Sequence, residues 1–264
     1  MLEQPPLGLY IHIPWCIRKC PYCDFNSHQA NGAIQERGYI TKLFDDFLYE
    51  YERLGDHTRE LQSIFIGGGT PSLFSGESYK ILIQNIRQHI NFSENIEITI
   101  EANPGTVDSG QFRSYIEAGI NRLSIGAQSF NNKHLEKLGR IHSKEDTITA
   151  INIAKSVGFK NFNVDLMHGL PGQSVESAIE DLKIAVDNAP THISWYQLTI
   201  EPNTYFYSYP PNLPEDIILD TIHERGIEVL ENNGYSQYDV SAFSQTSKGS
   251  THNCNYWNFS SYFI

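Results

Sequence analysis

Three cysteines lie close together near the start of the chain. Cys16, Cys20 and Cys23 have the spacing C-x3-C-x2-C. Thiolates on one short loop can each hold one iron of a cubane [4Fe–4S] cluster. The fourth iron then has no protein ligand within the loop, and an open iron can bind and activate a small molecule. The spacing therefore predicts an iron–sulfur cluster with one iron available for chemistry.

Two other uses of these cysteines fit the sequence less well. With His28 they could bind a structural zinc ion, but zinc sites more often combine two C-x2-C halves, and no second half follows. A disulfide pattern is weaker still, because the clustered cysteines are odd in number and the remaining one, Cys254, lies far downstream. The cluster is the favoured interpretation.

Composition narrows the class of protein. The chain has 264 residues and a formal net charge of −12 at pH 7, without a Lys/Arg-rich run. Nucleic acid and anionic membrane are therefore poor candidates as partners. The first residues lack the basic and apolar regions of a signal peptide, and no stretch is long and apolar enough to span a bilayer. Cysteines without a disulfide pattern favour the reducing cytoplasm.

Short apolar runs alternate with helical patterns along most of the chain. Strands are expected at 9–13, 63–67, 96–100, 122–126, 161–166 and 192–198, and helices between them at 39–54, 79–90, 111–118, 143–157 and 175–187. This alternation predicts an α/β fold with a parallel sheet and right-handed crossovers. Six units in about 200 residues favour a partial (β/α)6 TIM-like barrel, with an open doubly wound sheet as the alternative.

Polar residues and glycines follow the strands at the edge where either fold places its chemistry. The run Gly-Gly-Gly-Thr-Pro at 67–71 lets a ligand approach the backbone, and it matches neither a Walker A loop nor a dinucleotide fingerprint. Glu101 and Gln128 end the third and fourth strands, and Asp165 lies on the fifth. Each of these residues alone would be interpreted as a polar side chain with satisfied hydrogen bonds at the rim of the barrel. Together with the cysteine loop they predict a site.

The cysteine loop after the first strand and the glycine turn after the second resemble the radical S-adenosylmethionine superfamily. This resemblance implies that the methionine amino and carboxylate groups of S-adenosylmethionine chelate the fourth iron. Reductive cleavage of the cofactor then gives a 5′-deoxyadenosyl radical. The resemblance implies that the cofactor is contacted by Tyr10, Tyr22, Gly68, Gly69, Thr70, Glu101, Gln128, Arg140, Asp165 and Thr199. The Tyr22 ring would lie near the adenine, and Glu101 would accept hydrogen bonds from amino or ribose groups.

Longer segments resemble the oxygen-independent coproporphyrinogen III oxidase family, at 10–16, 20–25, 122–130 and 165–172. The dehydrogenase of that family has a fourth cysteine where this chain has Phe25, and an extension before the first strand. Both departures point to the HemW-like heme chaperones, whose marker is H-N-x-x-Y-W. The segment 252–257 reads His-Asn-Cys-Asn-Tyr-Trp. The resemblance implies that His252 binds heme iron; the alternative is a rim histidine beside core aromatics.

The branch resemblance implies a chaperone that binds heme, a [4Fe–4S] cluster and S-adenosylmethionine and transfers heme to an acceptor protein. Coproporphyrinogen III dehydrogenase is the alternative, so whether the chain is an enzyme stays open; a zinc or electron-transfer module is a third hypothesis. Implied partners are an acceptor, a reductant such as flavodoxin or ferredoxin, and peripherally contacted membrane heme proteins. We expect a partial barrel at 1–205, then a C-terminal region at 206–264 that ends before the family pattern does.

Overall fold

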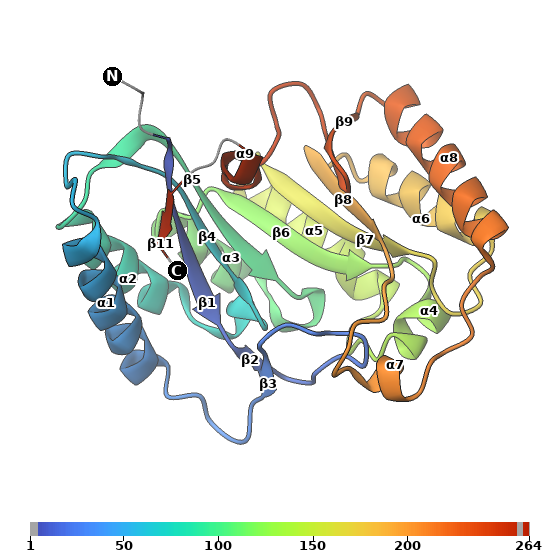
Figure 1. Ribbon diagram of the computed structural model, residues 1–264, viewed down its shortest axis with the longest axis horizontal. Coiled ribbons are helices and arrows are strands. Elements are labelled where there is room, and N and C mark those ends of the chain that lie inside the picture. Colours follow the sequence, from blue (N-terminus) through green and yellow to red (C-terminus); the bar gives the residue numbers. More distant parts are fainter. Residues whose placement is uncertain (1–4, 258–260, 264) are drawn as a thin grey trace.

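A computed structural model describes residues 5–257 and 261–263 (Figure 1). One nine-stranded sheet has the order β11-β1-β4-β5-β6-β7-β8-β10-β9. The strands are β1 (Leu7–Ile13), β4 (Leu61–Gly68), β5 (Phe92–Ala102), β6 (Arg122–Gln128), β7 (Phe162–His168), β8 (His192–Gln197), β9 (Ser236–Asp239), β10 (Ala242–Ser244) and β11 (Ser261–Phe263).

The strands from β11 to β8 pair in parallel, whereas β10 runs antiparallel to β8 and β9 antiparallel to β10. A helix follows each of β1, β4, β5, β6, β7 and β8 before the next strand of the sheet. The sheet curls into an open half-barrel (Figure 1). The predicted partial (β/α)6 barrel is therefore confirmed. The last three strands continue the same sheet, and the division at residue 205 stays a prediction.

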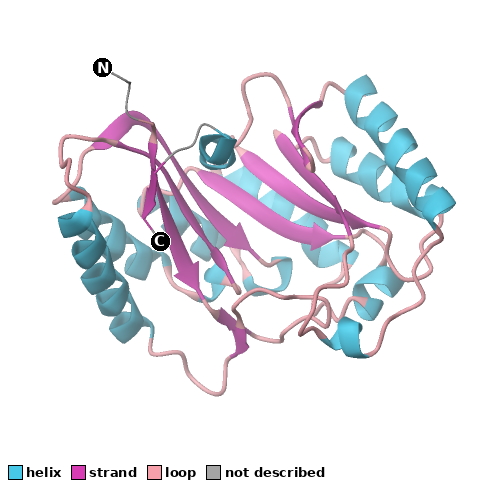
Figure 2. Ribbon diagram, viewed as in Figure 1, coloured by secondary structure: helices cyan, strands magenta, loops and turns pink. Residues whose placement is uncertain are grey.

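Helices cover the convex face of this sheet (Figure 2). They are α1 (Glu36–Arg53), α2 (Gly76–Arg87), α3 (Ser109–Glu117), α5 (Lys144–Val157), α6 (Val175–Asp187) and α8 (Asp216–Asn232). Local sequence fixes several ends: Ser143 and Asp146 form a capping box at the start of α5, and Gly158, with φ of 109°, ends that helix. Among the described helices, none combines the length and the apolar character needed to cross a membrane.

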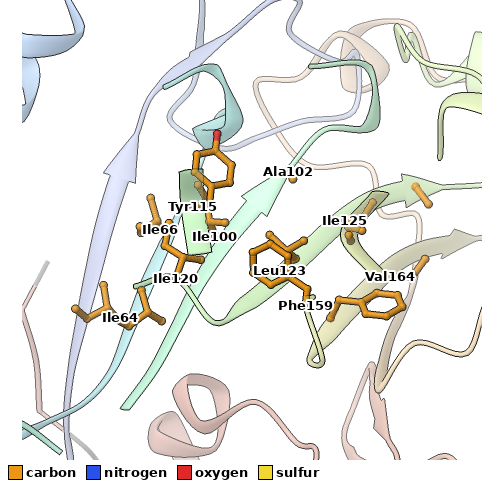
Figure 3. Close-up of a cluster of buried hydrophobic side chains, with 14 of the residues drawn as sticks. Ile64, Ile66, Ile100, Ala102, Tyr115, Ile120, Leu123, Ile125, Phe159 and Val164 are labelled. Carbon is orange, nitrogen blue, oxygen red and sulfur yellow. The ribbon is translucent and has the colours of Figure 1, made fainter. Parts of the chain in front are cut away.

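The core lies between the sheet and the helices, because side chains alternate across a strand. Isoleucine, leucine and valine side chains of the central strands fill it (Figure 3). They include Ile64, Ile66, Ile100, Leu123, Ile125 and Val164. The residues between them face the concave side, and many are polar: Ser63, Glu97, Thr99, Arg122, Ser124 and Asn163 are all buried there. One face of the sheet therefore forms the hydrophobic core, and the other face lines the polar interior of the half-barrel.

Short elements depart from the sequence prediction. One helical turn, α7 (Tyr205–Ser208), was not predicted from the sequence. Thr204 caps it by accepting a hydrogen bond from the Tyr207 N–H at 3.1 Å, and Phe206 is buried beneath it. Four further short elements were not predicted from the sequence: α4 (Asn132–Lys137), α9 (Thr251–Trp257), β10 and β11.

The contact between α8 and β8 gives a test of the packing. A Cβ on Gly226 would overlap the indole of Trp195, a side chain that is 2% exposed. We expect Gly226→Ala to lower the free energy of unfolding by about 1–3 kcal/mol. Gly38, in the first turn of α1, has open space around it, so Gly38→Ala should raise stability by about 0.5–1 kcal/mol. Denaturant unfolding measures both, and equal shifts in the two variants would contradict this packing.

Candidate functional site

The cysteine loop lies at the carboxyl ends of the strands, where β2 (Trp15–Cys16) pairs with β3 (His28–Gln29) (Figure 1). Main-chain hydrogen bonds join it to the turn after β4: the Gly69 N–H donates to Ile13 O and the Thr70 N–H to Trp15 O, both at 2.7 Å. A Cβ on Gly69 would lie 2.6 Å from Trp15 O. The glycine turn is therefore required by the close approach of two loops.

The three cysteines line one cavity of about 580 Å³. Cys16 is buried, and Cys20 and Cys23 are half-buried. Within residues 5–257, no three His, Cys, Asp or Glu side chains converge closely enough to hold a single metal ion. A cubane cluster does not need convergence on one point, because each thiolate binds a different iron. His28, the other zinc ligand considered, is exposed on β3 and does not line the cavity.

The cavity gathers most of the residues expected to contact a cofactor. They are Tyr22, Gly68, Gly69, Thr70, Glu101, Gln128, Arg140, Asp165 and Thr199. Tyr10 is not among the lining residues. Its hydroxyl is 3.0 Å from His12 Nδ1, and its ring stacks on Phe65, which does line the cavity, with ring centroids 6.3 Å apart.

Arg140 places a positive charge beside the cysteine loop. Its Nη1 donates to Cys20 Sγ at 3.6 Å, and its Nη2 donates to Gly126 O at 3.0 Å. Burial alone would lower the pKa of Arg140, but Tyr22 and Cys20 outweigh that effect and raise it. A guanidinium that stays charged favours thiolates and an anionic cluster. The donor set and its charge therefore fit a [4Fe–4S] cluster.

Two carboxyl groups face the same cavity. Burial raises the pKa of Glu101 to about 8, the nearby Asp165 adds to the rise, and the Gly68 N–H opposes it by donating to Oε2 at 3.1 Å. Burial also raises the pKa of Asp165, although hydrogen bonds from Ser124 Oγ at 2.9 Å and Asn163 Nδ2 at 2.7 Å oppose the rise. At neutral pH, Glu101 can therefore both donate and accept a hydrogen bond toward a ligand.

Several residues of the cavity wall were not selected from the sequence. Arg122, Ser124, Asn163 and Tyr196 line the cavity, and the Tyr196 hydroxyl donates to Gln128 Oε1 at 2.7 Å. Each lies on a predicted strand and alternates with core residues. That alternation was the available signal, but it could not tell which of the two faces encloses a cavity.

His252 lies on α9, at the end of the half-barrel opposite the cysteine loop (Figure 1). It is 2% exposed. Its Nδ1 is 2.9 Å from Ser63 Oγ, and its ring stacks on Phe65 with centroids 5.2 Å apart. Burial, with a further contribution from the charge of Arg122, lowers the pKa of His252 to about 4. The imidazole is thus neutral, and the adjacent Asn253 lines the cavity.

Glu97 on β5 holds the start of α9. Its carboxylate accepts hydrogen bonds from Ser250 Oγ and from the N–H groups of Thr251 and His252, each at 3.1 Å. A carboxylate at a helix N-terminus satisfies amides that lack partners within the helix. This contact therefore holds the start of α9 against the concave face of the sheet.

Comparisons with known proteins agree on the family. A family model described as the Radical SAM superfamily matches residues 10–185. The chain is 53% identical over 264 residues to a protein named heme chaperone HemW from Haemophilus influenzae, and 48% identical over 262 residues to HemW from Escherichia coli. Each alignment covers 99% of this chain and 69% of the relative.

One solved structure is similar over most of the fold. It is that of coproporphyrinogen III oxidase (HemN) from Escherichia coli, described as a radical SAM enzyme, with a TM-score of 0.83 and 26% sequence identity. The match covers 92% of this chain and 56% of that chain. The fold of this chain therefore has a counterpart of known structure.

The cysteines can be tested by reconstitution with iron and sulfide without oxygen. We expect the chain to take up one [4Fe–4S] cluster, and Cys16→Ala, Cys20→Ala and Cys23→Ala to lose its visible absorption. Cys254→Ala is the matched control, because Cys254 does not line the cavity and should leave the spectrum unchanged. A cluster that survives in all three loop variants would exclude the loop as its ligand.

Glu101 predicts a dependence of stability on pH in the metal-free protein. Its folded pKa of about 8 lies above the ordinary value of 4.5 for a glutamate, so the wild-type chain loses stability as pH rises between these values. We expect the free energy of unfolding of Glu101→Gln to be close to that of the wild type at pH 5. By pH 8.5 it should exceed the wild-type value by about 2–4 kcal/mol. Glu94→Gln, at an exposed position of β5, should show no such trend. A gain that is independent of pH would refute the assigned cause.

Proposed function

Because the chain belongs to the radical SAM superfamily and, within it, to the HemW family of heme chaperones, we propose that it binds heme and transfers it to an acceptor protein. The observation that carries this proposal is the alignment of almost the whole chain with proteins named heme chaperone HemW. The marker segment that contains His252 lies within that alignment.

Membership of the superfamily implies a [4Fe–4S] cluster and S-adenosylmethionine, and the residues at the cavity fit both. Cys16, Cys20 and Cys23 would hold the cluster, which supplies the electron that activates the cofactor. Arg140 would keep positive charge beside Cys20 Sγ. Glu101, held by the Gly68 N–H, would orient the polar groups of the cofactor.

We propose that His252 is the ligand of the heme iron, and the support for this is the chemistry of its side chain. Its pKa of about 4 keeps the imidazole neutral at physiological pH, as an iron ligand requires. The side chain is buried between α9 and β4, and its Nδ1 contacts Ser63 on β4. Because the side chain is 2% exposed, we expect heme to reach it when α9 shifts away from Glu97. Binding of heme and displacement of α9 would be one event.

The remaining partners belong to the same proposal. The acceptor is a protein that requires heme. The proposed acceptors include membrane heme proteins, which the chain would contact at the membrane surface. The reductant is a protein such as a flavodoxin or ferredoxin. A cytoplasmic location is supported by the four cysteines, which are all free thiols.

A second function is favoured by one observation, the similarity to the structure of HemN. In that case the chain would oxidise coproporphyrinogen III and form vinyl groups. Against it stands Phe25, which occupies the position of the dehydrogenase's fourth cysteine and is 58% exposed at the cavity. An anaerobic assay with coproporphyrinogen, S-adenosylmethionine and a reductant decides: vinyl products would establish the enzyme.

The heme assignment predicts a change in the Soret band. Heme added to the reconstituted protein should give a bound spectrum, and His252→Ala should weaken heme binding by about tenfold or more, because an axial ligand is lost. His57→Ala is the matched control, since His57 is exposed on the loop before β4. Glu97→Gln should speed heme uptake by loosening α9. An unchanged spectrum and affinity in His252→Ala would remove this residue from the site.

A further inference from the structure

A buried guanidinium in the interior of the half-barrel has no role in the function proposed so far. Arg122, at the start of β6, is 2% exposed and lines the same cavity as the cysteines. Its Nε has no hydrogen-bond partner among the residues that the structure describes. Its Nη1 donates one long hydrogen bond, of 3.4 Å, to Thr99 Oγ1. Burying a charged group with so few hydrogen-bond partners is unfavourable unless a ligand supplies the missing ones.

The acidic groups nearby are committed to other contacts. Glu97 Oε2 forms a long ion pair with Arg122 Nε, at 3.9 Å, which is beyond hydrogen-bond distance. The Glu97 carboxylate accepts instead from Ser250 and the first amides of α9. Asp165 accepts from Ser124 and Asn163, and Glu101 accepts from a main-chain amide of the glycine turn. The protein therefore neutralises the positive charge of Arg122 only partly. The side chain also borders the cavity, where a ligand can contact it.

Arg122 lies well away from the cluster loop. Gly126, whose carbonyl accepts from Arg140 beside Cys20, is further along the same strand, at roughly 13 Å from Arg122 by the rise of a β-strand. The main chain at Arg122 is thus far from the part of the cavity where the cluster would lie. Glu97 connects Arg122 to His252, because its Oε2 lies 3.9 Å from Arg122 Nε and its Oε1 accepts a hydrogen bond from the His252 N–H at 3.1 Å. The guanidinium and the histidine share one end of the interior.

We propose that Arg122 binds a carboxylate of the ligand that enters this interior, and that this carboxylate is a propionate of the tetrapyrrole. A guanidinium fork matches a carboxylate in shape and charge, and such a pair forms two parallel N–H···O bonds. Heme carries two propionates, so one molecule can offer its iron to His252 and a carboxylate to Arg122. This inference rests on the proposed heme binding and adds the group by which the chain orients the ligand.

The test compares heme with heme dimethyl ester, which keeps the iron and macrocycle but has no carboxylates. The wild-type chain should bind heme about tenfold to a hundredfold more tightly than the ester, as a charge-assisted pair predicts. Arg122→Gln should bind the two alike, by losing affinity for heme and not for the ester. Arg122→Lys should keep part of the preference. Arg113→Gln, at an exposed position of α3, is the control and should behave as wild type.

Other outcomes overturn the inference. Equal binding of heme and ester by the wild-type chain would show that no carboxylate is recognised, while heme binding itself would stand. An equal loss of both ligands in Arg122→Gln would assign Arg122 to the support of Glu97 and α9. A loss of S-adenosylmethionine affinity with an unchanged preference between heme and ester would assign the guanidinium to the cofactor's carboxylate. Failure of the wild-type chain to bind either porphyrin would remove the proposed function together with this subsite.

Discussion

The contact between the cysteine loop and the glycine turn is the interaction on which the rest of the site depends. Two main-chain hydrogen bonds, from Gly69 to the end of β1 and from Thr70 to the first residue of β2, hold the loop against the end of β4. These bonds form only because glycines bring the two backbones together, since a Cβ on Gly68 or Gly69 would meet atoms of the other segment at less than 3 Å. The thiols consequently face the cavity.

The interior of the half-barrel is polar because an open barrel does not close a second apolar core. One face of each strand packs under the helices, and the other must satisfy its polar groups internally. Asn163 and Tyr238 both bond the ring of His192, at 2.7 and 2.6 Å, and Tyr238 also accepts from the Ser250 N–H at 3.1 Å. Together with Glu97, this network joins the cavity wall to α9. This part of the cavity wall and α9 are therefore parts of one hydrogen-bonded structure.

Long elements were predicted from the sequence because their signals are local. The helix that begins at Ser143 and ends at Gly158 carries its own capping box and its own left-handed stop. The strands of the parallel units were found within a few residues of their ends from apolar runs alone. By contrast, β10 has three residues and exists through its pairing with β8 and β9. The one-turn helix α7 likewise depends on the burial of Phe206, which no local pattern reveals.

The sequence by itself determined the chemistry of the loop, because three cysteines in one short segment are close in space in any fold. It also determined the fold class, through the alternation of apolar runs and helical periods. Only the tertiary structure decided which distant residues meet. Strand register brought Arg122 beside Thr99, and the docking of α9 buried His252 against Ser63 and Phe65. Spacing along a chain fixes short distances alone, whereas contacts across a sheet follow from how the whole sheet is paired and covered.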